Sequence, residues 1–405
     1  MSVGKQPLPV MHAVPGLRLA ATCAGIKQEG RRDVVLMALD EGTQVAAVFT
    51  RNAFCAAPVH ICRAHLSQSA PRYLLTNTGN ANAGTGEQGV RDGLACCEAV
   101  AQAAGCATAA VLPFSTGVIG EPLPVEKITT AVPALLAALG DDGWADAAHG
   151  ILTTDTVPKG VSMQVSIDGV LVTVTGIAKG SGMIRPDMAT LLAYIATDAQ
   201  VAQPVLQACL EQAVARSFNR ITVDGDTSTN DSCLLMATGR SALRIGQADG
   251  SAFEALCTAV SEVCESLAQA MVRDGEGATK LMTIDVQGGL NSEECLLVAY
   301  AIAHSPLVKT AFFAADPNWG RILAVVGRAG LKNLDINAVQ LFLDDVCIVR
   351  DGGRASEYTE EAGQAVMDRD EINICVVLGR GEACEQVWSC DLSYDYVRIN
   401  AEYRT

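Results

Sequence analysis

The stretch Lys179-Gly180-Ser181-Gly182-Met183-Ile184-Arg185-Pro186-Asp187-Met188-Ala189-Thr190-Leu191-Leu192 holds a threonine at the entrance to a buried element. Its two glycines relax the backbone, and Pro186 excludes a helix through its own position. The apolar run that begins at Met188 then leads into the core. Because Ala189 is small, the hydroxyl of Thr190 has room to attack the carbonyl that precedes it. We therefore predict that the chain is cut between Ala189 and Thr190.

A β-hairpin is predicted over residues 165–178, directly before this stretch. Apolar and polar side chains alternate from Val165 to Ile167, Asp168-Gly169 supplies the turn, and valines at every second position come after it. The second strand of the hairpin therefore ends directly before the glycines.

The chemistry predicted for Thr190 is self-contained. Its attack would turn the peptide bond into an ester by an N-to-O acyl shift, and water would then hydrolyse the ester. Thr190 would be left with a free α-amine, whose unperturbed pKa is about 7.7–8.0. That amine can act as general base for the hydroxyl of the same residue, so no histidine is needed. The alternative is that Thr190 is one of many threonines at the start of a strand.

The stretch closely resembles the cleavage-site signature of the ornithine acetyltransferases, the bifunctional glutamate N-acetyltransferases of arginine biosynthesis, which mature by autoproteolysis before a threonine. The resemblance covers essentially the whole chain. It departs mildly at Arg185 and Asp187, where smaller or neutral residues are expected. The other matching blocks are Asn77-Thr78-Gly79-Asn80-Ala81-Asn82-Ala83, Ser115-Thr116-Gly117-Val118-Ile119-Gly120, Leu152-Thr153-Thr154-Asp155-Thr156, Asp224-Gly225-Asp226-Thr227-Ser228-Thr229-Asn230-Asp231, Asp274-Gly275-Glu276-Gly277-Ala278-Thr279-Lys280, Asp316-Pro317-Asn318-Trp319-Gly320-Arg321 and Ile399-Asn400-Ala401-Glu402-Tyr403-Arg404-Thr405.

This resemblance implies an α+β fold, a layered α-β-β-α sandwich with stacked, largely antiparallel sheets. It implies an α chain, residues 1–189, with the oxyanion hole and part of the substrate site. The β chain, residues 190–405, would start at the nucleophile Thr190 and hold the rest of that site. The two chains would stay intertwined, and two α and two β chains would associate.

Thr116 and Gly117 are the implied oxyanion stabilisers. They come after an apolar strand predicted over residues 109–113, so the Gly117 N–H and the Thr116 hydroxyl could both donate at a strand end. The alternative for Ser115-Thr116-Gly117 is a plain turn.

The resemblance also implies a set of contacts to the amino-acid substrate. Glu276, flanked by glycines, would hold the cationic amino group, although it could also cap a helix predicted over residues 251–273. The neighbouring Thr154 remains an alternative to Thr153 as the residue that contacts the substrate. The last residues of the chain would by default be frayed, but the resemblance folds them over the site. The implied substrate-binding residues are Thr153, Lys179, Thr190, Glu276, Asn400 and Thr405.

The implied reaction is a ping-pong acetyl transfer. Thr190 would take the acetyl group of N-acetylornithine, ornithine would leave, and glutamate would accept the group from the threonine ester. Both substrates carry an α-carboxylate, for which Lys179 is the candidate cation. The family also contains members that use acetyl-CoA as donor. The sequence does not decide whether this chain does so. Two alternatives remain: an amidase or aminopeptidase with a threonine nucleophile on a related fold, and an uncleaved homologue that only binds amino acids.

Composition limits the other classes of protein. With 405 residues, 49% of them hydrophobic, the chain can form two or three packed domains. The fifteen cysteines form no CxxC pair and many lie in apolar runs, which indicates reduced thiols in a cytoplasmic protein. Residues 1–14 lack a signal-peptide pattern, and no run of about 18 apolar residues occurs.

The charged and histidine residues exclude further classes. Lys and Arg number 29 against 45 Asp and Glu, for a net charge of −16 without a basic cluster, which argues against nucleic acid and membranes as partners. The five histidines show no metal-ligand spacing, so we expect no metal and no cofactor. Residues 84–89 read GxGxxG, but no acidic residue occurs about 20 positions later, so we predict a turn before a helix.

Helices and strands are predicted in mixed order along the chain. Hairpins, including one over residues 339–349 about Asp344-Asp345, favour antiparallel sheets over a doubly wound sheet. The predicted helices cover residues 88–104, 124–139, 201–216, 251–273 and 293–303. The predicted strands cover residues 45–50, 72–76, 109–112, 170–177, 341–349 and 373–378.

Overall fold

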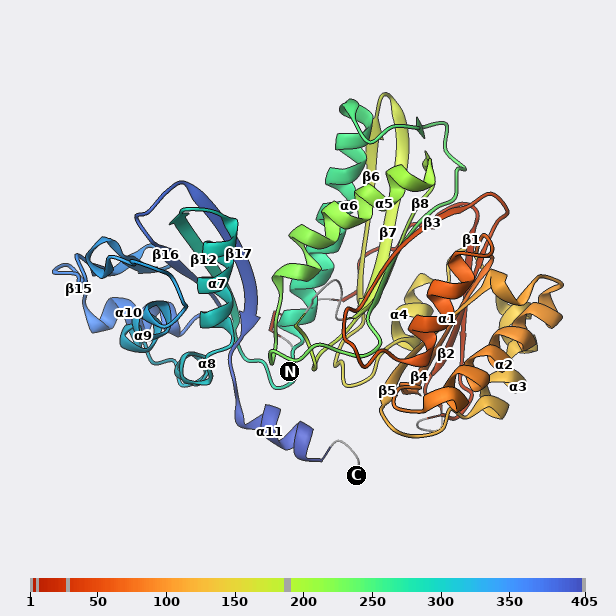
Figure 1. The fold of residues 1–405 in the computed structure, drawn as a ribbon, viewed down its shortest axis with the longest axis horizontal. Coiled ribbons are helices and arrows are strands. Elements are labelled where there is room, and N and C mark those ends of the chain that lie inside the picture. Colours follow the sequence, from red (N-terminus) through yellow and green to blue (C-terminus); the bar gives the residue numbers. More distant parts are fainter. Residues whose placement is uncertain (1–2, 5–6, 27–29, 186–190, 403–405) are drawn as a thin grey trace. The chain divides into compact units, whose positions relative to one another are not determined.

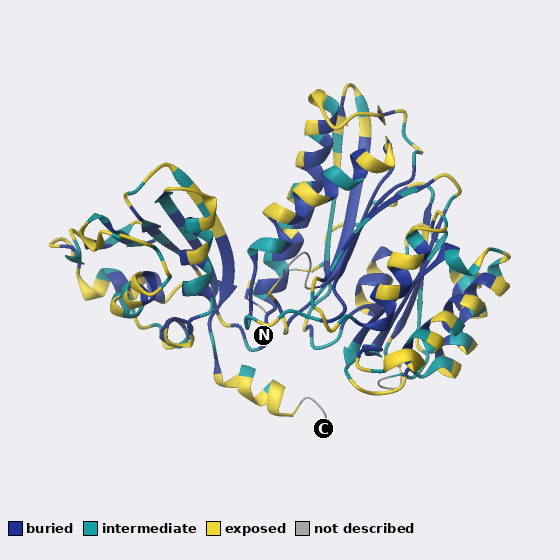
Figure 2. Cartoon of the chain, in the orientation of Figure 1, coloured by how far each residue is buried: buried dark blue, intermediate teal, exposed yellow. Residues whose placement is uncertain are grey.

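The computed structural model describes residues 3–4, 7–26, 30–185 and 191–402. The chain forms two compact units (Figure 1). The large unit comprises Pro7–Asn219 and Asp226–Met271, and the small unit comprises Met1–Gln6, Arg220–Gly225 and Val272–Thr405. Each unit buries the strands of its own sheets (Figure 2).

The first sheet of the large unit has four strands, with helices α2 and α3 on its outer face. Leu36 and Leu75 point toward the helices, where Cys97, Val100 and Leu135 complete an apolar cluster. The strands run in the order β1 (Leu17–Thr22), β2 (Val34–Leu39), β4 (Tyr73–Asn80) and β5 (Val111–Val118). The helices beside them are α1 (Ala57–Leu66), which contacts β5 and α2, then α2 (Gly86–Ala104) and α3 (Val125–Ala138).

The second sheet of the large unit has five strands and two outer helices. Its order is β3 (Gln44–Phe49), β10 (Ser232–Ala237), β8 (Leu192–Thr197), β7 (Val170–Lys179) and β6 (Lys159–Ile167). Helix α5 (Gln203–Arg216) lies on β3 and β10, and α6 (Gly250–Arg273) approaches β7 at Gly176. A short parallel pair, β9 (Gln200–Val201) and β11 (Arg244–Ile245), lies beside this sheet.

The inner faces of these two sheets meet in one apolar core. Phe114 of the first sheet and Tyr194 of the second form an edge-to-face pair with ring centroids 5.4 Å apart. The Tyr194 hydroxyl is also 2.8 Å from Thr76 Oγ1. Helix α4 (Trp144–Gly150) contacts strands of both sheets, and Trp144 is fully buried. The large unit is therefore an α-β-β-α sandwich, as predicted.

The small unit contains one six-stranded sheet with its own core. Apolar side chains of the sheet and of the helices over it are buried together. The strands run in the order β15 (Gly353–Arg354), β14 (Val346–Arg350), β13 (Gln340–Leu343), β16 (Glu371–Val377), β12 (Leu281–Gly289) and β17 (Ala383–Cys390). The helices are α7 (Ser292–Ala303), α8 (Pro306–Phe313), α9 (Trp319–Gly327), α10 (Glu360–Met367) and α11 (Tyr394–Ala401), with a 3-10 turn at Ile336–Ala338. Other 3-10 turns occur at Thr108–Ala110 and Phe218–Arg220.

Every helix and strand predicted above is present, with its ends shifted by a few residues. The hairpins at Asp168-Gly169 and Asp344-Asp345 are confirmed. A helix does follow the start of the GxGxxG block, but it begins at Gly86, so the turn predicted over residues 84–89 is shorter than expected. The sheets are largely antiparallel, but within the described residues each of the three larger ones includes one parallel pair: β4–β5, β8–β10 and β12–β16. Helices lie between the paired strands in the chain, and they supply the crossover that parallel pairing requires.

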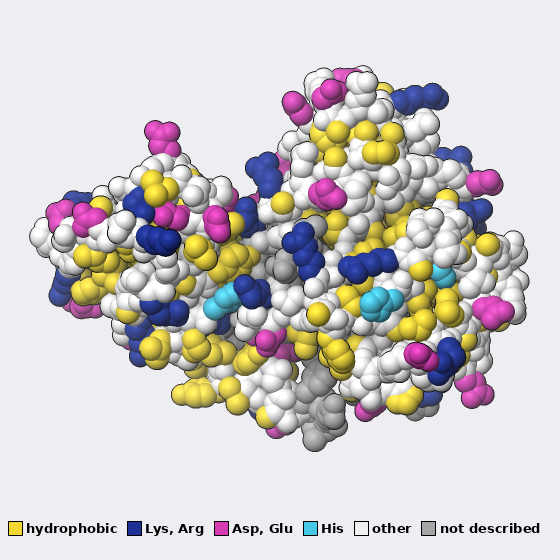
Figure 3. Space-filling view, in the orientation of Figure 1, with side chains coloured by type: hydrophobic (Ala, Val, Ile, Leu, Met, Phe, Trp, Pro, Cys, Tyr) yellow, Lys and Arg dark blue, Asp and Glu magenta, His cyan; other side chains and the backbone are white. Residues whose placement is uncertain are grey.

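All fifteen cysteines lie in the described residues and are free thiols, most of them buried. Acidic side chains appear on both units on the face drawn in Figure 3, in keeping with the net charge of −16. Among the described helices none is by itself long and apolar enough to cross a membrane; α7 and α8 together pass that test of length and composition, with a bend of 58° between them.

Candidate active site

Thr116 and Gly117 lie near the end of β5, where the first sheet meets the segment after β7. The strand continues through Val118, so the predicted end at residue 113 and the plain turn at residues 115–117 are both wrong. Gly117 pairs with Gly79 of β4 and has a φ of 136°. A Cβ on Gly117 would lie 2.3 Å from the carbonyl carbon of Gly79, so only glycine fits this position.

Lys179, the last residue of β7, reaches Thr116. Its Nζ donates a hydrogen bond to Thr116 Oγ1 at 3.1 Å. Thr116 is itself buried. Because the Thr116 oxygen already accepts from an ammonium, the proton of its hydroxyl is left to donate to another acceptor. This pairing gives a hydroxyl donor and a nearby cation at one point.

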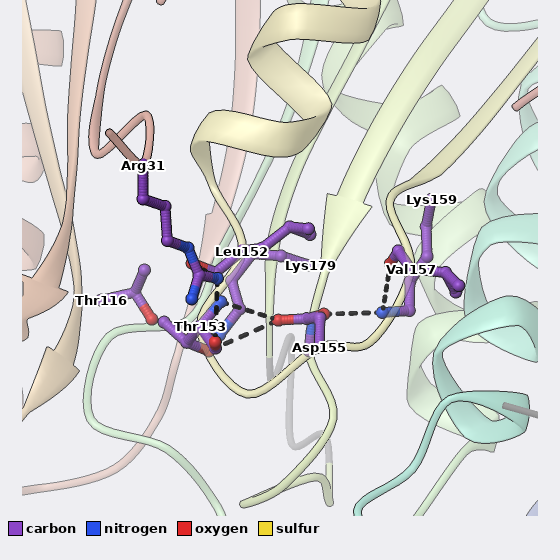
Figure 4. A network of polar contacts seen from close by, with 9 residues as sticks. Arg31, Thr116, Leu152, Thr153, Asp155, Val157, Lys159 and Lys179 are labelled. Carbon is purple, nitrogen blue, oxygen red and sulfur yellow. Dashed lines mark hydrogen bonds and ion pairs between the residues drawn. The ribbon is translucent and has the colours of Figure 1, made fainter. Parts of the chain in front are cut away.

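Asp155 connects the Thr153 loop to the end of β7 (Figure 4). Its Oδ2 accepts from the Thr153 N–H at 3.0 Å, and its Oδ1 accepts from the Gly180 N–H at 2.8 Å. Lys159 Nζ forms a fully buried ion pair with the same carboxylate at 2.6 Å. Burial opposes the charged form of Asp155, but Lys159 and Lys179 outweigh burial and lower its pKa. One ionised carboxylate thus holds the backbone of Thr153 and the backbone directly after Lys179.

Arg31 joins this group from the first sheet's side. Its Nη2 donates to the carbonyls of Leu152, at 3.2 Å, and Thr153, at 3.0 Å (Figure 4). The backbone before Asp155 is therefore fixed on both sides.

A small cavity of about 30 Å³ opens between Thr116, Lys179 and the loop before β10. Asp231 contributes a carboxyl to its wall and is only 2% exposed. Burial raises the pKa of Asp231 well above its usual range, although a hydrogen bond with Ser228 and the charge of Lys179 act in the opposite direction. The remaining lining residues are Gly182, Met183, Ile184, Leu191, Leu192, Ser228 and Asn230.

Asn230 also lines the cavity and is bonded to two backbone carbonyls. Its Nδ2 donates to the carbonyls of Ala81, at 2.6 Å, and Ser115, at 2.9 Å. Sequence reasoning missed Asp155, Asn230 and Asp231 as site residues. These residues belong to the matching blocks. The sequence does not show, however, whether an acidic or amide residue in a polar run is buried.

The cleavage point lies outside the described residues. That applies to Ala189 and Thr190, and also to Thr405 at the C-terminus. The described chain resumes at Leu191, whose carbonyl accepts from the Ser232 N–H at 2.8 Å before β8 begins. Leu191 itself lines the cavity.

Glu276 and Asn400 come together in the small unit. Glu276 is buried, and its Oε2 accepts from Asn400 Nδ2 at 2.8 Å. A Cβ on Gly277 would lie 2.5 Å from the Tyr396 backbone nitrogen, so this glycine lets α11 approach closely. The chain end is helical over Tyr394–Ala401, and the frayed alternative is wrong for that part. Glu276 lies beyond the end of α6, in a turn closed by Ala278 N–H and the Gly275 carbonyl.

The predicted site residues thus form two groups, one in each unit. Thr116, Gly117, Thr153 and Lys179 belong to the large unit, and Glu276 and Asn400 to the small one. The first group offers oxyanion donors and a cation, and the second offers a carboxylate for a cation. Within the described residues no cluster of three or more His, Cys, Asp or Glu side chains could hold a metal ion.

Comparison with known proteins identifies relatives along the whole chain. A model of the ArgJ family matches residues 18–405. The "Arginine biosynthesis bifunctional protein ArgJ" of Pseudomonas syringae pv. tomato is 60% identical over 406 residues, with 100% of each chain covered. The protein of the same description from Methylococcus capsulatus is 57% identical over 392 residues, with 97% of this chain and 96% of the relative covered.

Two solved structures are also similar in sequence. The Bacillus halodurans "Arginine biosynthesis bifunctional protein argJ" is 38% identical, covers 51% of this chain and 96% of its own, and has a TM-score of 0.49. The Mycobacterium tuberculosis "Ornithine Acetyltransferase complexed with Ornithine" is 35% identical, covers 45% of this chain and 98% of its own, and has a TM-score of 0.40.

Proposed function

The chain belongs to the ArgJ family, and on that premise we propose that it is the glutamate N-acetyltransferase of arginine biosynthesis, transferring acetyl from N-acetylornithine to glutamate. It is an acyltransferase, as the family and its relatives are. The observation that carries the mechanism is the hydrogen bond from Lys179 to Thr116, since it joins the proposed oxyanion residue to the cleavage stretch.

In the first half-reaction, Thr190 attacks the acetyl carbonyl of N-acetylornithine. Its free α-amine takes the hydroxyl proton and later gives a proton to the departing ornithine nitrogen. The Thr116 hydroxyl and the Gly117 N–H donate to the oxyanion, and each donor of this kind contributes about 2.7–4 kcal/mol to transition-state stabilisation. The acetyl group is then an ester on Thr190.

In the second half-reaction, the amine of glutamate attacks this ester. The same donors hold the oxyanion, and acetylglutamate leaves while the Thr190 hydroxyl is restored. Because both substrates carry an α-carboxylate, Lys179 can serve as the cation for both. Thr153 lies on the same network and completes this part of the substrate site.

Glu276 binds the cationic amino group of the substrate in this proposal. Its carboxylate is buried and is held by Asn400, so it is positioned before a ligand arrives. Thr405 at the chain end adds a further polar contact. The ornithine complex of the Mycobacterium tuberculosis relative supports an amino acid of this type as ligand.

Self-cleavage divides the precursor into an α chain, residues 1–189, and a β chain, residues 190–405. The strand order supports chains that stay intertwined: β8 and β10 of the second chain lie between β3 and β7 of the first. We further propose an assembly of two α and two β chains in the cytoplasm, where all fifteen thiols stay reduced.

Acetyl-CoA is proposed as a second acetyl donor for glutamate. The relatives are described as bifunctional, which supports a second activity. Purified enzyme given acetyl-CoA and glutamate, without N-acetylornithine, should form acetylglutamate; no product would leave the ornithine-dependent transfer alone.

The test of the main proposal begins with the intact mass of the purified protein under denaturing conditions, beside a Thr190→Ala variant. The wild type should give two fragments that meet between Ala189 and Thr190, and the variant should stay near the full 42.2 kDa. An uncut wild type would favour a homologue that only binds amino acids and would overturn the mechanism.

The second part of the test tracks the acetyl group. Isotope-labelled acetylornithine should pass its label to glutamate, and the label should appear on Thr190 when glutamate is withheld. Release of the label as acetate at the same rate with and without glutamate would instead identify an amidase.

A further inference from the structure

Self-cleavage needs a proton-transfer group that the mechanism above does not supply. Before the cut, the Thr190 nitrogen is an amide and cannot act as a base. The same nitrogen must gain a proton as its bond to the Ala189 carbonyl carbon breaks. Another group must therefore transfer this proton, and an ionisable side chain near the cleavage point is the candidate.

The cavity lined by Leu191 has two ionisable side chains among its described lining residues, Lys179 and Asp231. The Lys179 ammonium already donates to Thr116 Oγ1. Asp231 is 2% exposed, and its Oδ2 has no hydrogen-bond partner among the described residues. A buried carboxyl oxygen in that state costs free energy unless another group uses it.

The backbone ties Asp231 to the cleavage point. The next residue, Ser232, donates its N–H to the Leu191 carbonyl at 2.8 Å. Ser232 also pairs with Leu192 in the parallel ladder between β10 and β8. Asp231 and Leu191 directly precede the paired residues Ser232 and Leu192, so both lie at the same end of the sheet. In the sequence, Leu191 directly follows Thr190.

We propose that the Asp231 carboxyl transfers the proton that the Thr190 nitrogen requires when the Ala189–Thr190 peptide bond breaks. The inference rests on the proposed self-cleavage and adds a residue to it. In the shift, the bond from Thr190 Oγ1 to the Ala189 carbonyl carbon forms and the carbon–nitrogen bond breaks. Asp231 gives its proton to the nitrogen, and the proton leaving the hydroxyl restores the carboxyl. Water then hydrolyses the ester, so no other reactant is needed.

The charges around Asp231 suit this role. Burial raises the pKa of Asp231 and so favours its protonated form, while the lysines near Asp155 lower the pKa of that carboxyl and favour its ionised form. Two carboxyls whose pKa values are driven apart by their surroundings are a sign of separate acid and charge-stabilising roles. The charge of Lys179 lowers the pKa of both carboxyls.

The test measures self-cleavage over time, in precursor made by cell-free translation and quenched into denaturant for intact mass. Asp231→Asn keeps the shape but cannot transfer a carboxyl proton, so cleavage should slow at least about a hundredfold. Asp198→Asn is the matched control, because Asp198 is also buried with a raised pKa but lies just after the opposite end of β8. This control should cleave at the wild-type rate.

The outcomes separate this inference from the proposed function. If the wild type cleaves and Asp231→Asn cleaves equally fast, this inference alone is overturned. If the wild type does not cleave, the proposed mechanism falls with it.

A second variant decides the matter even if Asp231→Asn does not fold. The hydrogen bond with Ser228 lowers the pKa of Asp231, so Ser228→Ala should raise that pKa. Since the protonated carboxyl is the active form, the wild-type cleavage rate should fall as pH rises through this pKa, and the fall should move to higher pH in Ser228→Ala. A purely structural role would leave the pH profile where it was, and that result would overturn the inference.

Discussion

Gly117 shows how one backbone conformation fixes the proposed oxyanion hole. Its φ of 136° and its contact with Gly79 leave no room for a side chain. Gly117→Ala should push the end of β5 away from β4 and misplace an oxyanion donor. We expect acetyl transfer to fall by about a hundredfold or more, in line with the loss of such a donor.

The control for this variant is Gly120→Ala. Gly120 also has a positive φ, of 86°, but a Cβ there would meet nothing within 4 Å. Gly120→Ala should pay only the cost of an alanine at a positive φ, without a steric clash, and should keep most of its activity. Steady-state kcat measured for both variants checks the prediction, and equal activities would show that the approach of Gly79 does not matter.

Asp155 makes folding stability depend on pH. Its pKa is lowered in the folded chain, so its ionised form stabilises the fold at pH values above its unfolded pKa of about 3.9. That stabilisation is lost as pH falls through the lower folded pKa. Asp155→Asn also leaves buried Lys159 without its counter-charge, which costs about 3–5 kcal/mol for a pair of this kind.

Urea unfolding at several pH values, in a Thr190→Ala background, measures this effect. The gap in free energy of unfolding between parent and Asp155→Asn should be constant near neutral pH and should shrink below about pH 4. Glu87→Gln, which breaks an exposed pair with Arg91, should leave the free energy of unfolding unchanged. A gap that grew on acidification would contradict the assigned direction.

At the scale of elements, the two sheets of the large unit are joined by a polar contact within an apolar core. The hydroxyls of Thr76 on β4 and Tyr194 on β8 are 2.8 Å apart and fully buried. Tyr194→Phe would leave the Thr76 hydroxyl buried without its partner, at a cost of about 1–3 kcal/mol. Thr76→Val in the same chain should recover part of that loss, because both polar groups are then removed.

A double-mutant cycle by chemical denaturation gives the coupling between these residues. Additive losses in the double variant would mean that the hydroxyls do not interact.

Another element explains the block Asp316 to Arg321, for which the sequence indicated no chemistry. The Asn318 side chain caps α9 by accepting from the Arg321 N–H at 3.3 Å. Arg321 Nη1 in turn donates to the Leu307 carbonyl at 2.7 Å and ties α9 to α8. The block therefore has a structural role in the small unit.

At the scale of the whole molecule, the strand order determines whether the two fragments stay together after cleavage. The five-stranded sheet has the order β3, β10, β8, β7, β6. The proposed β chain supplies β10 and β8, and strands of the α chain flank them on both sides. The fragments should co-purify in native buffer and separate only on unfolding. Native mass spectrometry or affinity capture through a tag on one fragment checks this, and recovery of the tagged fragment alone would contradict it.

The sequence by itself determined the local structure and the chemical type of the site. Alternation of apolar residues and the turn at Asp168-Gly169 depend on near neighbours, and so the β6–β7 hairpin could be predicted. The cleavage stretch and the resemblance that it carries likewise identified the residues proposed for the oxyanion hole and the substrate.

Only the tertiary structure decided which side chains are buried and what they meet. The parallel pair β8–β10 joins residues about 40 positions apart and brings Asp231 to the end of the cleavage stretch. Asp155 and Asp231 are the same residue type in similar polar runs, yet a buried lysine lowers the pKa of one and burial raises the pKa of the other. Those pKa values depend on the surrounding fold, because desolvation and Coulomb interactions act through space and not along the chain.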